Sequence, residues 1–148
     1  MKILFICHAN ICRSFMAQEF LNHLLNGKGF EVFSRGLFAN SYSEVPSKVK
    51  NYLASFGVPS SPHTPTLLSA KDLKEADLVF VMEESQLDFL RDRYAEYTEK
   101  MFLLFDYAFG KEEDAADPFA LSGRSFEKSA ARILEAVKAI AAKVNAVK

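Results

Sequence analysis

The sequence predicts a doubly wound α/β fold, in which a four-stranded parallel sheet carries helices on both faces. Short apolar runs that suit buried strands alternate along the chain with segments whose apolar residues recur at helical spacing. Strands that alternate with helices imply parallel strands joined by right-handed crossovers. Ligands of such sheets bind at the carboxyl ends of strands beside a topological switch point, and the loop that leaves the first strand is the expected place.

Four apolar runs have the composition of strands that are covered on both faces. The clearest is residues 78–82, and the first, residues 2–6, is too short to be the core of a signal peptide. We expect the other two strands at residues 30–34 and 101–105. The first strand therefore leads directly into a loop that begins with Cys7.

Helices are predicted between and after these strands. Ser14 can cap a first helix that runs to about residue 26, and Gly57 should end a second helix that follows Pro46. Ser69 begins a capping signal for a short helix. We further expect a polar helix through about Tyr94, a long connection over residues 106–123, and a last helix over residues 126–144.

The composition suits one domain over residues 1–148 and narrows the classes of partner. Lys and Arg total 18 against 19 for Asp and Glu, so a net charge of −1 gives no electrostatic reason to expect nucleic acid or an anionic membrane. No apolar stretch approaches the roughly 20 residues of a membrane span. The chain has only two cysteines, which cannot form a disulfide framework, so we expect a cytoplasmic protein. We also expect a monomer.

The loop after the first strand places a cysteine and an arginine at a spacing that suits phosphate chemistry. Between a strand and a helix N-terminus, backbone amides can form a nest for a dianion, and the helix dipole adds a partial positive charge. Cys7 lies in that field, which favours the thiolate, and Arg13 can direct its planar fork at two phosphate oxygens. The alternative is a buried core cysteine followed by an arginine that pairs with a surface acid.

Three segments resemble the low-molecular-weight protein tyrosine phosphatases. The family pattern Cys-x-Gly-Asn-Ile-Cys-Arg-Ser-Pro-x-Ala is similar to the loop CHANICRS at Cys7–Ser14 and the Met16-Ala17 that follows. Its Ala-Asp-Leu-x-x-x-Met-Asp/Glu stretch is similar to residues 76–83, and its Asp-Pro-Tyr acid loop to Asp117-Pro118-Phe119. The order and spacing agree over essentially the whole chain, with departures at Ala9, usually Gly, and at Phe15, usually Pro.

The resemblance implies a phosphatase that hydrolyses phosphotyrosine in a protein substrate through a phosphocysteine, without metal or cofactor. Cys7 is then the nucleophile, Arg13 binds the equatorial oxygens, and Asp117 is the general acid and later the base. Ser14 donates a hydrogen bond to the Cys7 sulfur, and Asn10 takes a left-handed backbone conformation. Ser34 and His63 support the loop, and the residues expected to bind phosphate or substrate are His8, Ala9, Asn10, Ile11, Cys12, Ser14 and Phe119.

The residues alone leave the general acid and the walls of the substrate slot open. The connection over residues 106–123 also contains Asp106, Glu112, Glu113 and Asp114. Pro118 and Phe119 favour Asp117 modestly, although Asp-Pro is also a common turn sequence. Phe119 could stack on a substrate ring, whereas Phe38 and Tyr42 either form the opposite wall or pack as ordinary loop residues. Cys12 either forms a reversible disulfide with Cys7, as in the family, or fills space.

Two rival functions follow from the same loop. A thiol-dependent arsenate reductase needs further cysteines to carry electrons away from the first, and none follows Cys12. A phosphate-binding module would bind phosphotyrosine or another anion without turnover, and phosphate release from a phenyl phosphate ester separates it from an enzyme. No metal-ligand spacing links His8, His23 and His63.

Overall fold

The computed structural model describes residues 1–118 and 121–147 of the chain, and it confirms the predicted fold class. Parallel strands form one sheet in the order β2-β1-β3-β4. The strands are β1 Lys2–Cys7, β2 Glu31–Gly36, β3 Leu78–Val81 and β4 Met101–Leu103. The chain goes from β1 to the neighbour on one side and then to the neighbour on the other side. The carboxyl end of β1 therefore lies at the switch point where such sheets bind ligands.

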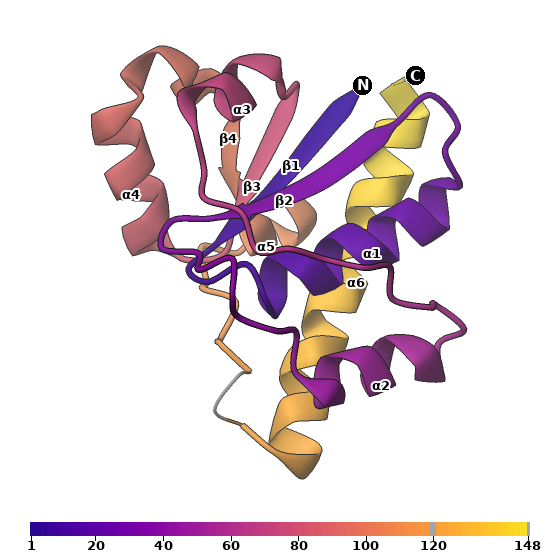
Figure 1. Ribbon diagram of the computed structural model, residues 1–148. Helices are drawn as coiled ribbons and strands as arrows, with labels where there is room; N and C mark the ends of the chain where they lie inside the picture. The colour runs from indigo at the N-terminus through magenta and orange to yellow at the C-terminus, as the bar shows by residue number, and fades with distance from the viewer. Residues whose placement is uncertain (119–120, 148) are drawn as a thin grey trace.

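Helices cover both faces of the sheet (Figure 1). Ile3 and Phe5 of β1 belong to a core formed with α1 and α6, whereas Leu4 and Ile6 pack on the other face with α3 and α4. The helices are α1 Arg13–Leu25, α2 Ser47–Ser55, α3 Ala70–Glu75, α4 Glu84–Arg93, α5 Leu104–Phe109 and α6 Gly123–Val147, with a 3-10 helix, η1, at Ala95–Lys100. Within the described part of the chain, no helix has both the length and the apolar character that a membrane span needs.

The start of α1 differs from the prediction that Ser14 caps it. The helix begins at Arg13, and Cys12 occupies the N-cap position without a capping side chain. Ser14 is fully buried, and its hydroxyl is bonded to Cys7 and Asn10 instead. The hydroxyl therefore serves the loop and not the helix terminus. Ser69, by contrast, caps α3 as predicted.

The fourth strand is shorter than predicted, and an unpredicted helix follows it. β4 ends at Leu103, and α5 occupies the last two positions of the predicted strand and the beginning of the predicted connection. Leu104 and Phe105 are both buried, and a short apolar run does not distinguish a strand from a buried helical turn. Gly110, at φ 70°, ends α5 in the left-handed conformation that glycine favours.

The second strand is longer than predicted and continues toward the loop after β1. Its pairing with β1 extends through Ile6–Arg35 and Cys7–Gly36. Ser34 therefore lies inside β2 and not at its end. The extension brings residues 34–38 alongside the loop, where Leu37 N donates to Cys7 O at 3.0 Å and Phe38 N donates to His8 O at 2.9 Å.

Candidate active site

The loop between β1 and α1 surrounds a cavity at the carboxyl end of the sheet. The cavity has a volume of about 210 Å³, and its described lining residues are Cys7, His8, Ala9, Ile11, Cys12, Arg13 and Asp117. Six of these belong to one loop and the start of α1, and Asp117 comes from the segment between α5 and α6. The structure thus brings together the expected nucleophile, phosphate clamp and acid.

The sulfur of Cys7 is held between two polar groups of its own loop. Cys7 Sγ lies 2.9 Å from Ser14 Oγ and accepts a hydrogen bond from Asn10 N at 3.3 Å. Asn10 Nδ2 donates to Ser14 Oγ at 2.9 Å, so the Ser14 hydroxyl proton is available to donate to the sulfur. Two donors aimed at one sulfur suit a thiolate, which is the nucleophilic form of cysteine.

Asn10 is the centre of the hydrogen bonds that keep the loop open. It is fully buried, and its φ of 61° is the left-handed conformation that the resemblance implied. Its side chain donates to Ser34 Oγ at 2.8 Å and accepts from Thr66 N at 3.0 Å. The Ser34 hydroxyl donates onward to Gln18 Oε1 at 2.6 Å. The loop is therefore tied to β2, to α1 and to the segment before α3.

His63 also supports the loop, through the backbone carbonyl of Asn10. Its Nε2 lies 2.7 Å from the Asn10 carbonyl oxygen, and because a carbonyl only accepts, this nitrogen carries the proton. Burial lowers the pKa of His63, and the Asn10 bond and nearby Glu19 only partly oppose that effect. The ring stacks on Phe15 at a centroid distance of 4.3 Å. Phe15, which stands where the family usually has proline, thus packs against a loop support.

Arg13 is buried and is anchored by one of its two terminal nitrogens. Nη1 donates to Glu83 Oε2 and to the Ala115 carbonyl, both at 2.8 Å. Nη2 lies 3.8 Å from Asp117 Oδ2, on the side of the cavity. The alternative interpretation, an arginine paired only with a surface acid, does not describe this side chain, because it is 3% exposed, also donates to the Ala115 carbonyl and lines the cavity. Because Glu83 and Ala115 hold Nη1, Nη2 points toward the space that a phosphoryl group would occupy.

Among the acids considered from the sequence, Asp117 is the one that lines the cavity. Asp114 Oδ1 accepts from Glu84 N at 2.8 Å and caps α4, and Glu113 pairs with Arg132 at 2.6 Å. Asp106 lies in α5, and neither it nor Glu112 belongs to the lining. The position favours Asp117 as the acid. Phe119, expected to stack on the substrate, lies outside the described residues.

The structure also bears on the expectations for Ala9, for Cys12 and for the two aromatic residues Phe38 and Tyr42. Ala9 has no positive φ, so the position does not need the glycine that is usual in the family. Cys12 is buried, and burial, with the nearby charges of Asp117 and Cys7, raises its pKa to about 12. Both cysteines are free thiols. Phe38 and Tyr42 are 65% and 92% exposed and are not among the described residues of the cavity lining.

Several residues that position the site were not identified as functional from the sequence. Glu83 directly follows the third apolar run, and an acid at the carboxyl end of a neighbouring strand is a signal that could have identified it. Gln18 and Thr66 lie in a helix face and a proline-rich loop, and nothing local marks them. Gly36 is a fourth residue that positions the site, because the loop backbone passes close to its Cα.

We expect Gly36→Ala to impair catalysis more than stability. A Cβ there would lie 2.8 Å from His8 O and 3.0 Å from the Cβ atoms of Asn10 and Ala39, and the carbonyl is backbone that cannot rotate away. A displacement of about 1 Å in a catalytic loop can cost on the order of 10² in rate. The measurement is kcat/KM for nitrophenyl phosphate beside a thermal unfolding curve. Gly27→Ala, at φ 70° with no neighbour within 4 Å, is the control that strains the backbone away from the loop.

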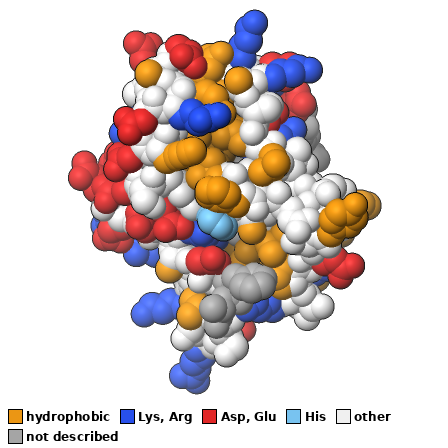
Figure 2. All heavy atoms as spheres, turned by 60° about the vertical axis from the view of Figure 1, so that its left-hand side comes forward, with side chains coloured by type: hydrophobic (Ala, Val, Ile, Leu, Met, Phe, Trp, Pro, Cys, Tyr) orange, Lys and Arg blue, Asp and Glu red, His pale blue; other side chains and the backbone are white. Residues whose placement is uncertain are grey.

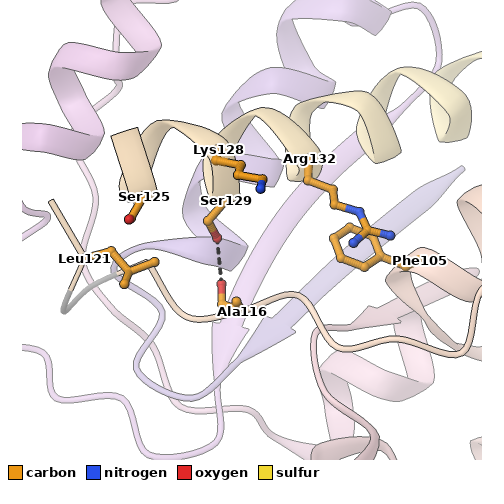
Figure 3. Close-up of a pocket in the computed structure, with 7 residues that line it drawn as sticks. All are labelled: Phe105, Ala116, Leu121, Ser125, Lys128, Ser129 and Arg132. Carbon is orange, nitrogen blue, oxygen red and sulfur yellow. Dashed lines mark hydrogen bonds between the residues drawn. The ribbon is translucent and has the colours of Figure 1, made fainter. Parts of the chain in front are cut away.

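A second cavity lies behind the segment that carries Asp117 (Figure 3). Its volume is about 380 Å³, and it is lined by residues of α5, α6 and the segment between them. Ser129 Oγ donates to the Ala116 carbonyl at 3.0 Å and ties that segment to α6. None of the expected catalytic or phosphate-binding residues that the structure describes lines this cavity, so the candidate active site is the cavity around Cys7.

The fold and the loop define a class: α/β proteins with a phosphate-binding loop that opens on a cysteine. The family model described as low molecular weight phosphotyrosine protein phosphatase matches residues 2–148. The chain therefore belongs to the low-molecular-weight phosphotyrosine protein phosphatase family and is a hydrolase.

Relatives within the family carry two different substrate names. A protein of Geobacillus stearothermophilus named "Protein-arginine-phosphatase" is 34% identical over 118 residues, which cover 80% of this chain and 78% of that protein. A Ralstonia nicotianae protein named "Probable low molecular weight protein-tyrosine-phosphatase EpsP" is 33% identical over 145 residues, covering 97% and 96%. The solved low molecular weight protein tyrosine phosphatase from T. tengcongensis matches with a TM-score of 0.89 at 32% identity, covering 97% of this chain and 99% of that one. Membership of the family alone does not choose between the substrates.

Proposed function

We propose that the protein hydrolyses phosphotyrosine in protein substrates through a phosphocysteine at Cys7. The observation that carries the proposal is the cavity in which Cys7, Arg13 and Asp117 lie together. The sulfur has two donors from its own loop, the arginine is anchored in a fixed orientation, and the Asp117 carboxyl group lines the same cavity, 3.8 Å from Arg13. These are the parts that a double displacement at phosphorus requires.

In the first step, Cys7 Sγ attacks phosphorus. The sulfur–phosphorus bond forms while the bond from phosphorus to the tyrosine oxygen breaks, and Asp117 gives its proton to the departing phenolate. In the second step, Asp117 accepts a proton from the attacking water, the sulfur–phosphorus bond breaks, and phosphate leaves. Arg13 and the loop amides bind the phosphoryl oxygens throughout, and Ser14 stabilises the sulfur as it leaves. This route uses no metal or cofactor, and we place it in a monomer in the reducing cytoplasm.

The walls of the cavity favour a phenyl ring over a phosphorylated guanidino group. Ala9 and Ile11 offer no side-chain acceptor, and Asp117 is the carboxylate among the described lining residues. Phosphoarginine keeps several N–H donors after phosphorylation, and burying those beyond the reach of Asp117 against the apolar walls costs free energy. A phenyl ring has no such donors and gains from contact with apolar side chains. The chemistry of the cavity wall therefore supports phosphotyrosine, even though several relatives are named for arginine.

Peptides that differ only in the phosphorylated residue test this choice. We expect kcat/KM for the phosphotyrosine peptide to exceed that for the phosphoarginine and phosphoserine peptides by roughly tenfold or more. The readout is released inorganic phosphate, with Cys7→Ser protein as the control for contaminating phosphatases. A preference for phosphoarginine would reassign the substrate. Saturable binding without phosphate release would identify a binding module instead of an enzyme.

Asp117→Asn should slow the first chemical step most for the poorest leaving group. Tyrosine's phenolate needs a proton as it leaves, whereas nitrophenolate needs it far less. General acid catalysis is worth on the order of 10²–10⁴ in rate, so phosphocysteine formation from phosphotyrosine should fall much further than from nitrophenyl phosphate. Rapid-quench measurement of that step is required, because Asp117 also serves hydrolysis of the intermediate.

The matched control for that variant is Asp114→Asn, which keeps the oxygen that caps α4 and lies outside the cavity lining. Its first step should stay close to wild type for both substrates. Equal and small effects of Asp117→Asn on both substrates would move the acid role to another residue.

A further inference from the structure

A groove lies beside the active-site cavity. It has a volume of about 260 Å³ and lies between residues 37–38 after β2 and the first turns of α4. We call it the flanking groove; it is lined by Leu37, Phe38, Ser85, Gln86 and Phe89, together with His8 and Glu83. Figure 2 shows an apolar strip that runs down this face of the molecule toward a histidine, with acidic side chains gathered to its left.

The flanking groove adjoins the active-site cavity. His8 lines both spaces, and Glu83 of the groove holds Arg13 of the cavity. The ring of Phe38 packs on the ring of His8 at 4.8 Å, and Phe38 N donates to His8 O. A polypeptide whose phosphorylated side chain enters the cavity therefore passes His8, and one direction along its backbone leads into the groove.

The side chains that line the groove suit an apolar residue of a bound polypeptide in extended conformation. Phe38 and Phe89 remain 65% and 41% exposed, which leaves large apolar surfaces uncovered on both sides of it. Gln86 is 7% exposed, and its Oε1 is the buried side-chain acceptor without a partner in the described part of the chain. Because Gln86 lines the groove, a rotation of its side chain that exposes this acceptor to a peptide N–H would satisfy it. Glu84 and Asp88 are exposed on α4 next to these residues and would repel an acidic segment.

We propose that the flanking groove binds the substrate polypeptide beside its phosphorylated residue and selects a bulky apolar side chain there. This side chain packs between Phe38 and Phe89, and the peptide backbone lies over Gln86. The proposal rests on the proposed function for the identity of the phosphorylated residue. It adds a sequence preference that the cavity alone does not provide, since the cavity encloses only the phosphorylated side chain.

Phosphotyrosine peptides with Leu, Ala or Asp immediately before or after the phosphorylated residue test the proposal. In one of the two positions, we expect kcat/KM for Leu to exceed that for Ala by roughly tenfold, with Asp lower still. Phe89→Ala should reduce the preference for Leu over Ala to about twofold or less, and Phe89→Leu should restore most of it. Phe109→Ala, which shortens an exposed phenylalanine of α5, should keep the wild-type preference.

Affinity of the same peptides for Cys7→Ser protein gives a second measurement that needs no turnover. If no phosphopeptide is hydrolysed, the proposed function is wrong, and the binding preference still decides the role of the groove. Equal values for Leu and Ala at both positions, or a preference that survives Phe89→Ala, would overturn the proposal. Self-association in light scattering that Phe89→Ala abolishes would also overturn it, because the groove would then bind a second copy of the chain.

Discussion

Cys7→Ser protein is expected to lose phosphate release by on the order of 10⁴–10⁶-fold while it still binds inorganic phosphate at the loop. The sulfur is the atom that Ser14 and Asn10 N contact, and a serine hydroxyl is a far weaker nucleophile in the same place. The loop amides and Arg13 are unchanged by the substitution. Turnover and phosphate affinity should therefore separate, which distinguishes a lost nucleophile from a collapsed loop.

The experiment compares single-turnover phosphate release with phosphate affinity from calorimetry in the same preparations. Cys12→Ser makes the same atomic change at the other cysteine of the cavity. Ser14 Oγ and Asn10 N contact the Cys7 sulfur and not that of Cys12, so the loss should be far smaller. Turnover by Cys7→Ser within tenfold of wild type would reject the assignment of the nucleophile. Loss of both turnover and phosphate affinity would show that the loop had collapsed.

Arg13→Lys is expected to reduce turnover by on the order of 10³, despite the conserved charge. Arg13 divides its guanidinium between two tasks, since Nη1 binds Glu83 and the Ala115 carbonyl while Nη2 faces the cavity. A lysine has a single terminal nitrogen and cannot perform both tasks. If the ammonium binds Glu83 it leaves the phosphate, and if it binds phosphate it leaves a buried carbonyl without a donor.

The measurement is kcat and KM for nitrophenyl phosphate, together with the midpoint of thermal unfolding. Arg132→Lys is the matched control, because Arg132 also pairs with an acid, Glu113, but lies outside the active-site cavity. A loss of less than tenfold for Arg13→Lys would show that Arg13 acts only through its charge. Equal losses for both variants would point to a general effect on the fold.

The part of the fold next to the site could be predicted from the sequence because its signals are local. The first apolar run, the loop residues and the start of α1 follow one another within about two dozen positions, and β1 and α1 lie nearly where expected. The helix α5 could not be predicted, because Leu104 and Phe105 extend an apolar run, and such a run does not distinguish a strand from a buried helical turn. The prediction for Ser14 failed for another reason. Its side chain is suited to capping a helix, but in the structure its hydroxyl contacts Cys7 and Asn10.

The supports of the site could be predicted only in part. Ser34 and His63 lie where the resemblance implied, bonded to Asn10, yet the residues that complete the network do not share a local pattern. Glu83 contacts Arg13, and Gln18 contacts Ser34, because the sheet order and the direction of α1 bring them there. Such contacts depend on tertiary packing, which periodicity and capping signals do not encode.

The two anchors of Arg13 also bear on how the protein acquires activity as it folds. Glu83, which follows β3, is 70 positions from Arg13 along the chain. Ala115, in the segment after α5, is 102 positions away. Contacts of such sequence separation form late relative to local helices, because long loops must close first. During refolding, helical signal should return before catalytic turnover. An N-terminal fragment that ends before β3 contains every residue of the loop Cys7–Ser14, yet it lacks both groups that orient its arginine.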